Sequence, residues 1–383
     1  MEKRVARVLR MEANKALGPG ENYLSDIVRI KLDVVLGSGR TTRKSLIVKR
    51  KTENTFVVDT YNIFEHETQM YSEMLPQMEY LMDDFNDRRD YLWAEYYGAT
   101  DDMIVFQDLK PEGFVLGDRH EGLDLEHSLM VMMSLARFHA LGVALVSRGK
   151  LNAQRLPIHI LARNDKITNK FYKGGVQTLA QTMYDTWGPK WKSTSQKLRS
   201  IGETLGDQIQ ELYKLDDSSF KVINHGDCWV NNMLFKYEPG TKRPEAMRFV
   251  DFQCCHYNSY GWDLIYFLYS STQPSARHHH MAELLDAYHD TLTSSLGLYG
   301  CRQDNVPTRE DMDREAERLQ LVGLMVAATL APITMADPKD AMEIGKMEDE
   351  TVEVAQNQGM YLNERYKAAV QQDLEYFMNK GIL

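Results

Sequence analysis

Three polar residues in the second half of the chain, Asp227, Asn232 and Asp251, have the types and the spacing that transfer of a phosphoryl group requires. Asp227 and Asn232 lie in the run HGDCWVNN, and Asp251 follows in the run VDFQ. In such reactions one carboxylate accepts or orients the proton of the acceptor hydroxyl, while an amide and a second carboxylate hold Mg²⁺ against the nucleotide phosphates. The sequence therefore predicts ATP and Mg²⁺ as cofactors, with Asp227 as the base and Asn232 and Asp251 as metal ligands.

The segment between Asn232 and Asp251 indicates how these two residues come to share a metal ion. Two apolar runs, 233–237 and 246–252, are joined by the sequence EPGTKRP, and this pattern predicts a β-hairpin. The hairpin would return Asp251 to the side of Asn232. Asp and Asn also commonly cap helices and turns. The prediction therefore depends on the whole set, including the GWD run that ends at Asp263.

A second pair of charged residues lies in the N-terminal quarter of the chain. The run SLIVK, which ends at Lys49, has the composition of a β-strand. Residues 64–75 have helical periodicity and place Phe64, Glu67 and Tyr71 on one face. A solvated surface position is the ordinary alternative for any lysine or glutamate. Their order ahead of the two aspartate motifs favours a functional role for both Lys49 and Glu67.

Together these motifs resemble those of the kinase-like small-molecule phosphotransferases, the group that includes choline kinases and aminoglycoside phosphotransferases. Within it, the runs HGDCWVNNMLF and VDFQ look most like the ecdysteroid kinase-like family of insects. The resemblance implies an α+β, bilobal protein kinase-like fold. A small β-rich N-lobe would span residues 1–106, a hinge residues 107–114, and a larger, mostly helical C-lobe residues 115–383. A chain of 383 residues is long enough for two lobes.

The resemblance also implies roles for individual residues. Lys49 would contact the α- and β-phosphates of ATP, and Glu67 would hold that lysine in place. The FxxExxxY pattern of the family favours Glu67 over its neighbour Glu65. His225 would support the catalytic loop rather than react, and Asp263 would hydrogen-bond that loop from below.

The loop that covers the nucleotide phosphates is the poorest match, because the chain contains no GxGxxG sequence. We expect residues 18–25, which precede a strand-like run at 27–36, to form this lid. Ser25 and backbone N–H groups would then reach phosphate oxygens. The second glycine cluster, at 37–39, is expected to be the turn of a structural hairpin.

The segment after the short predicted strand 103–106 corresponds to the hinge of the family. Gln107, Asp108 and Leu109 are therefore candidates for binding the adenine edge, chiefly through backbone groups. An ordinary linker is the alternative at each of these positions.

Two helices are predicted from apolar periodicity. Residues 125–146 carry apolar side chains at three- and four-residue spacing, which is typical of a core helix, and Asp124 is a suitable N-cap. Residues 1–17 show similar spacing among Arg, Lys and Glu, without the continuous apolar core of a secretory signal. We expect a docked N-terminal helix there, with a transit peptide as the alternative.

Composition excludes several classes of partner. A net charge of −10 argues against nucleic acid and against an anionic membrane surface. No run reaches the roughly 20 apolar residues of a membrane span. Four cysteines without a CxxC pair indicate a reducing compartment, so we expect a cytoplasmic protein.

The acceptor is the least determined part of the prediction. Aromatic residues that could bind a flat apolar molecule are found in the segment 156–205: Phe171, Tyr172, Tyr184, Trp187 and Trp191. Core packing explains them equally well. The family resemblance favours a hydroxyl of a lipophilic small molecule, an ecdysteroid or related steroid alcohol. The alternatives are a detoxifying kinase for foreign hydroxyl compounds, a catalytically silent kinase-fold binding protein, and a metal-dependent hydrolase, which would need more histidine ligands.

Overall fold

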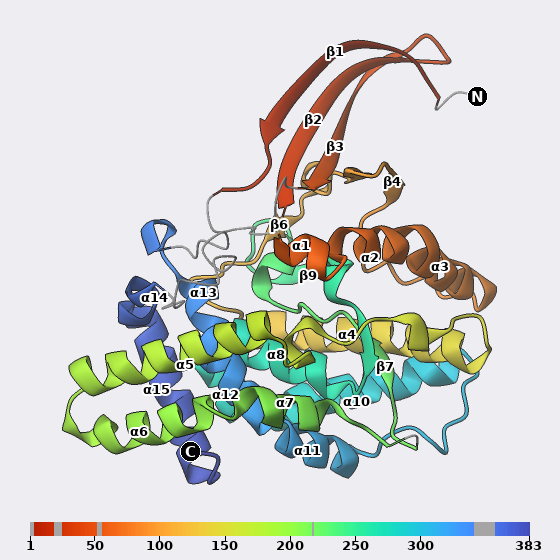
Figure 1. Ribbon diagram of the computed structural model, residues 1–383. Helices are drawn as coiled ribbons and strands as arrows, with labels where there is room; N and C mark the ends of the chain where they lie inside the picture. The colour runs from red at the N-terminus through yellow and green to blue at the C-terminus, as the bar shows by residue number, and fades with distance from the viewer. Residues whose placement is uncertain (1–3, 19–24, 52–55, 217, 341–356) are drawn as a thin grey trace.

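The computed structural model describes residues 4–18, 25–51, 56–216, 218–340 and 357–383, and these form two lobes (Figure 1). The small lobe contains an antiparallel sheet with helices below it. The large lobe consists mainly of helices. The predicted α+β, bilobal kinase-like fold is therefore confirmed, whereas the lobe boundaries drawn from the sequence stay a prediction.

The sheet of the small lobe has five strands in the order β1-β2-β3-β5-β4, and all neighbours are antiparallel. The strands are β1 (Val5–Lys15), β2 (Ser25–Leu36), β3 (Thr41–Lys51), β4 (Tyr96–Ala99) and β5 (Met103–Gln107). In Figure 1, β1 to β3 extend beyond the rest of the lobe as a long curved ribbon. The β2–β3 turn includes Gly39 at a φ of 83°, so the predicted hairpin at 37–39 is present.

The N-terminal segment is a strand rather than the predicted helix. β1 pairs with β2 along its length, with Met11 opposite Leu32. Almost all side chains of β1 are exposed, so the helical spacing of Val5, Val8 and Leu9 does not mark a buried face. Backbone pairing with β2 decides the structure here, since tertiary context readily overrides local propensity.

The helical part of the small lobe carries the predicted helix at 64–75. This part of the lobe consists of α1 (Phe56–Thr60), α2 (Ile63–Gln69), the single π-helical turn η1 (Met70–Met74) and α3 (Leu75–Asp84). The predicted helix corresponds to α2, η1 and the start of α3. Phe64, Glu67 and Tyr71 are all buried, as expected for one face. The ring of Tyr71 packs against the ring of Phe106 in β5, with 4.5 Å between the ring centroids, and this contact anchors the helix against the sheet.

The helices of the large lobe are α4 (Leu125–Ser147), α5 (Lys166–Thr186), α6 (Lys192–Gly202), α7 (Leu205–Tyr213), α8 (Gly261–Ser271), α9 (Pro274–His279), α10 (Met281–Leu298), α11 (Arg309–Arg318), α12 (Gln320–Thr329), α13 (Ala331–Met335), α14 (Gln358–Leu362) and α15 (Glu364–Asn379). The predicted core helix is α4, and the Asp124 side chain accepts a hydrogen bond from the His127 N–H at its N-terminus. α4 packs against α10 at the centre of the lobe.

The large lobe also contains two small antiparallel sheets of short strands. β6 (Val115–Leu116), β8 (Met233–Tyr237) and β9 (Pro244–Phe249) form one sheet, and β7 (Val222–Asn224) pairs with β10 (His256–Asn258). β8 and β9 are the predicted hairpin, with Met233 opposite Phe249. Just beyond this pair, the Val250 N–H donates to the Asn232 carbonyl at 3.0 Å. The hairpin therefore brings Asn232 beside Asp251.

Among the described residues, length and composition alone would allow α4 to cross a membrane. The segments Arg309–Arg318 and Gln320–Met335, which are bent by 51° where they meet, pass the same test together. About two thirds of the most apolar stretch of α4 (67%) is buried inside the protein, as in the core helix of a globular lobe.

Candidate active site

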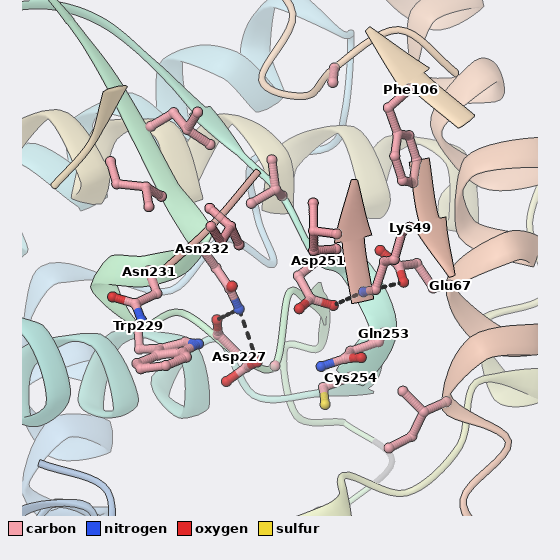
Figure 2. Close-up of a pocket in the computed structure, with 18 of the residues that line it drawn as sticks. Lys49, Glu67, Phe106, Asp227, Trp229, Asn231, Asn232, Asp251, Gln253 and Cys254 are labelled. Carbon is pink, nitrogen blue, oxygen red and sulfur yellow. Dashed lines mark hydrogen bonds and ion pairs between the residues drawn. The ribbon is translucent and has the colours of Figure 1, made fainter. Parts of the chain in front are cut away.

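A cavity of about 490 Å³ lies between the two lobes, and the charged residues singled out in the sequence line it. Lys49 and Glu67 come from β3 and α2 of the small lobe. Asp227, Asn232 and Asp251 come from the loop between β7 and β8 and from the end of the β8–β9 hairpin. Figure 2 shows their side chains converging from both lobes.

Lys49 is held by two carboxylates. Its Nζ lies 2.5 Å from Glu67 Oε2 and 2.7 Å from Asp251 Oδ1, and both Lys49 and Glu67 are buried. Burial alone would lower the pKa of Lys49, but the charges of Asp251 and Glu67 outweigh it and raise the pKa above its usual value. The lysine is therefore a fixed positive charge in the lining of the cavity.

Asp251 reaches this ion pair because of its backbone conformation. Its φ of 67° and ψ of 61° lie in the left-handed region, which few residues other than glycine adopt. The strained turn after β9 directs the carboxylate back toward Lys49, 202 positions earlier in the sequence. Such strain is characteristic of functional sites, where the surrounding structure maintains it.

The loop that carries Asp227 is held from below by Asp263, which lies in the first turn of α8. Asp263 Oδ2 accepts from the His225 N–H at 2.7 Å, and Oδ1 accepts from the Gly226 N–H at 2.8 Å. His139 Nε2, from α4, lies 3.0 Å from the same carboxylate. The structure thus places Asp263 below the loop and His225 within it, with His225 Nε2 at 3.0 Å from the Val250 carbonyl.

Position 226, directly before Asp227, accommodates only glycine. Its φ is +82°, and a Cβ atom there would lie 2.1 Å from the backbone carbonyl oxygen of Cys254. The loop therefore passes directly against the segment after Asp251, which fixes the separation of the two aspartates.

Asp227 lies deep in the cavity, and both of its carboxylate oxygens accept hydrogen bonds. Oδ1 accepts from the Tyr266 hydroxyl at 2.7 Å, and Oδ2 accepts from Asn232 Nδ2 at 2.9 Å. Burial raises the pKa of Asp227 to about 7, and the charge of Asp251 acts in the same direction, while the two hydrogen bonds oppose it. A carboxyl group with a pKa near the operating pH is suited to accept a proton during a reaction.

Asn232 and Asp251 have the donor atoms that a magnesium ion would require. The Asn232 amide nitrogen is committed to Asp227, which leaves its carbonyl oxygen available, and Figure 2 shows Asn232 directed toward Asp227 and Asp251 directed toward Lys49 in the same cavity. No group of three or more His, Cys, Asp or Glu side chains forms a metal cluster among the described residues. Mg²⁺ usually takes one or two carboxylates together with substrate phosphates, so this donor set fits it. The metal stays a prediction.

The hinge candidates line the cavity, and their binding of an adenine edge through backbone groups stays a prediction. Gln107, Asp108 and Leu109 follow β5 and contribute to the cavity wall. The Asp108 carboxylate accepts from Arg29 Nε at 2.8 Å and from the Ser45 hydroxyl at 2.5 Å. Its side chain is therefore occupied within the small lobe, and backbone groups of this segment are the ones left to meet a purine.

The predicted lid falls largely outside the described residues, since 19–24 are not among them. Ala16, Leu17 and Ile27, on either side of this segment, line the cavity. Ser25 begins β2 opposite Lys51 and is not among the described lining residues. Its contact with phosphate stays a prediction.

The aromatic residues expected to bind the acceptor are mostly elsewhere. Phe171 lines the cavity. Tyr172, Trp187 and Trp191 are buried in the core, with the two tryptophan rings packed edge to face at 5.4 Å. Tyr184 lies on the surface beneath Lys192. Only Phe171 of this group faces the cavity, so core packing explains Tyr172, Trp187 and Trp191, and Tyr184 is a surface residue.

Sequence reasoning missed Tyr266 and His159, which both contact the catalytic loop. Tyr266, on α8, hydrogen-bonds Asp227 and lines the cavity. His159 Nε2 lies 2.7 Å from the Gly226 carbonyl, and burial lowers the pKa of His159 to about 4, so it is neutral and donates this bond. The one available signal was the position of Tyr266 three residues after Asp263, one helical turn further along α8.

Comparison with known proteins places these features in a family context. The model of the ecdysteroid kinase-like family matches residues 19–301. No match was found among curated proteins. Among solved structures, the AMP-bound complex of the spectinomycin phosphotransferase APH(9)-Ia is similar over 87% of this chain and 90% of its own, at 10% identity and a TM-score of 0.38. The gentamicin complex of APH(2'')-IIa is similar over 85% and 94%, at 14% identity and a TM-score of 0.35.

Proposed function

Because this chain belongs to the ecdysteroid kinase-like family and is a small-molecule phosphotransferase, we propose that it transfers the γ-phosphate of ATP to a hydroxyl group of a lipophilic acceptor, a steroid alcohol of the ecdysteroid class. The observation that carries this proposal is the mixed lining of the cavity. Lys49, Asp227 and Asp251 line it together with a set of apolar side chains from the large lobe, called the apolar wall below.

The apolar wall consists of side chains from several elements of the large lobe. It includes Ile160, Leu161, Ile167, Phe171, Leu330 and Ile333. Contact with such a wall removes apolar surface from water, worth roughly 25 cal/mol per Å² buried. A fused-ring alcohol would gain from this burial while presenting a hydroxyl group to Asp227.

The charge of the cavity argues against cationic acceptors. Of the carboxylates that line it in the described residues, Glu67 and Asp251 face Lys49, and Asp108 faces Arg29. The cationic side chains Arg29, Lys49 and Lys110 line the cavity as well, so it is not strongly acidic. A polycationic acceptor would need a strongly acidic cleft, and a quaternary amine would need an aromatic cage with carboxylates.

The proposed mechanism assigns each residue one task. Lys49, steadied by Glu67, neutralises phosphate charge, and Asn232 and Asp251 would hold Mg²⁺, which supplies further charge neutralisation at the phosphates when bound. Asp227 accepts the proton of the acceptor hydroxyl while the oxygen of that hydroxyl bonds to the γ-phosphorus. The bond from that phosphorus to the β-phosphate oxygen breaks, and ADP leaves. Orientation and electrostatic stabilisation provide most of the rate enhancement.

The test is phosphate transfer from Mg-ATP by the purified protein and by Asp227→Asn. The panel contains ecdysteroids, other sterols, choline, aminoglycosides and plant phenolic glycosides, with detection of the added phosphate by mass spectrometry. We expect phosphorylated steroid from the wild type, a loss of about 10² to 10⁴ in turnover for the variant, and retained ATP binding. Asp290→Asn, on an exposed part of α10, is the matched control and should keep full activity.

Each other outcome has a defined meaning. Product from phenolic glycosides alone would replace the steroid acceptor by foreign hydroxyl compounds. ATP binding without any product would favour the silent binding protein, although the set of Lys49, Glu67, Asp227, Asn232 and Asp251 in one cavity argues against it. Undiminished turnover in Asp227→Asn would reject that aspartate as the base.

A further inference from the structure

The helix α8 holds the catalytic loop at two successive points. In its first turn, Asp263 accepts hydrogen bonds from the backbone N–H groups of His225 and Gly226. One turn later, the Tyr266 hydroxyl donates a hydrogen bond to Asp227 Oδ1, with 2.7 Å between the two oxygen atoms. Residues three apart on a helix lie on the same side. One face of a single helix therefore holds both the backbone of the loop and the side chain that it presents to the cavity.

The Tyr266 side chain has little freedom to move. It is 7% exposed, and its ring packs edge to face against the ring of His159 at 6.5 Å between centroids. Only χ1 sets the position of a tyrosine hydroxyl oxygen, because this oxygen lies on the χ2 axis, and the packing of the buried ring restricts χ1. The hydroxyl oxygen is consequently held at one position on the cavity wall, beside Asp227.

A buried tyrosine commonly bonds its hydroxyl to the nearest acceptor, so the bond to Asp227 could be ordinary core satisfaction. The partners of the other cavity carboxylates help to distinguish a positioning role of Tyr266 from ordinary core satisfaction. Glu67, Asp251 and Asp108 are each paired with a cationic side chain. Among the described lining carboxylates, Asp227 alone is held by uncharged donors, a phenol and an amide.

Uncharged donors orient a carboxylate without neutralising it. Each carboxylate oxygen has about two acceptor sites, so one hydrogen bond to each leaves a second site for the acceptor hydroxyl. We propose that Tyr266 is a positioning residue that fixes the carboxylate of Asp227 for the incoming hydroxyl group; this inference rests on the proposed function.

The experiment compares Tyr266→Phe with Tyr269→Phe. Tyr269 lies on the same helix, is buried, and donates its hydroxyl to Gln320 Oε1 at 3.0 Å, away from the cavity lining. Both variants lose one buried hydroxyl and keep the ring. We expect Tyr266→Phe to lower kcat about 10- to 100-fold with KM for ATP and acceptor within about threefold. Tyr269→Phe should keep the wild-type kcat.

A double-variant cycle with Asp227→Asn separates positioning from a general structural effect. If Tyr266 acts through Asp227, then Tyr266→Phe should change kcat by less than about threefold in the Asp227→Asn background. The full loss in that background, or an unchanged kcat in the single variant, would overturn the inference.

A crystal structure of Tyr266→Phe keeps the test independent of the acceptor. We expect the Asp227 carboxylate to rotate or to occupy more than one rotamer once the phenol is removed. An Asp227 side chain unchanged in position would count against the inference. If the wild-type protein phosphorylates no compound of the panel, the proposed function fails, and the orientation of Asp227 in this crystal still decides the role of Tyr266.

Discussion

The substitution Asp263→Asn should destabilise the protein by about 3–5 kcal/mol, because one buried carboxylate accepts hydrogen bonds from two backbone N–H groups and faces an imidazole. An asparagine keeps one oxygen and replaces the other with an NH₂ group. That group must then face another donor, and at least one buried donor loses its partner. A hydrogen bond to a charged group contributes roughly 1.5–3 kcal/mol, and an unsatisfied buried donor costs about 1–3 kcal/mol.

The loss should depend on pH in a defined direction. Burial alone would raise the pKa of Asp263, but the hydrogen bond from His139 and the charges around it hold the pKa below its usual value. A lowered folded-state pKa stabilises the protein above the unfolded-state pKa of about 3.9, and this contribution is lost as the pH falls through the folded-state pKa. The difference between wild type and variant is therefore full at pH 7 and shrinks below about pH 4.

Thermal unfolding at pH 7 provides the assay. A loss of this size in the large lobe should lower Tm by roughly 6–10 °C or more. Asp124→Asn is the matched control, because Asp124 caps α4 at an exposed position where asparagine caps equally well, and it should cost less than about 1 kcal/mol. A Tm within about 2 °C of wild type, accompanied by a selective loss of kcat, would refute the reasoning and move Asp263 into the chemistry.

Three further substitutions test other parts of the molecule. Lys49→Met should raise KM for ATP about tenfold or more, because a fixed phosphate-binding charge is removed, and steady-state kinetics with unchanged KM would place the phosphates elsewhere. Ile333→Trp should fill part of the cavity beside the apolar wall and raise KM for the acceptor about tenfold. ATP binding, measured by calorimetry, should stay as in wild type. Weaker ATP binding would show that this wall faces the nucleotide. Burial alone would raise the pKa of Asp87, but hydrogen bonds from Arg89 and Tyr299 lower the pKa to about 2, so its stabilisation is lost between about pH 4 and pH 2. Asp87→Asn should accordingly reduce the urea midpoint at pH 7 more than at pH 3, and an equal reduction at both would contradict this assignment.

The polar centre of the cavity could be predicted because its signals are local. The turn sequence between β8 and β9 is sufficient to indicate a hairpin, and a hairpin necessarily brings Asn232 and Asp251 together. Lys49 and Glu67 precede the aspartates in the sequence, and this order was enough to assign both residues to the small lobe. The second partner of Lys49, Asp251, was not predicted, because that contact depends on the left-handed turn after β9.

The remaining features depend on how elements pack. Every residue of α8 from Gly261 to Ser271 is buried, so its apolar pattern has no polar side from which to infer that Tyr266 faces the cavity. Similarly, α5 carries aromatic residues on more than one side, and only its placement in the lobe selects Phe171. β1 is a strand because β2 is available to pair with it. None of these relations is contained in a single stretch of sequence.

The contacts of Asp108 have a mechanical consequence for the two lobes. Arg29 in β2 and Ser45 in β3 both bond its carboxylate, so the start of the hinge is tied to two strands of the small lobe. Any bending of this connection must therefore take place after this point. Gly113, at a φ of 92°, is the first residue beyond it whose backbone lies in the glycine-favoured region. We expect residue 108 to keep its place against β2 and β3, so that the connection bends at the turn that ends in Gly113.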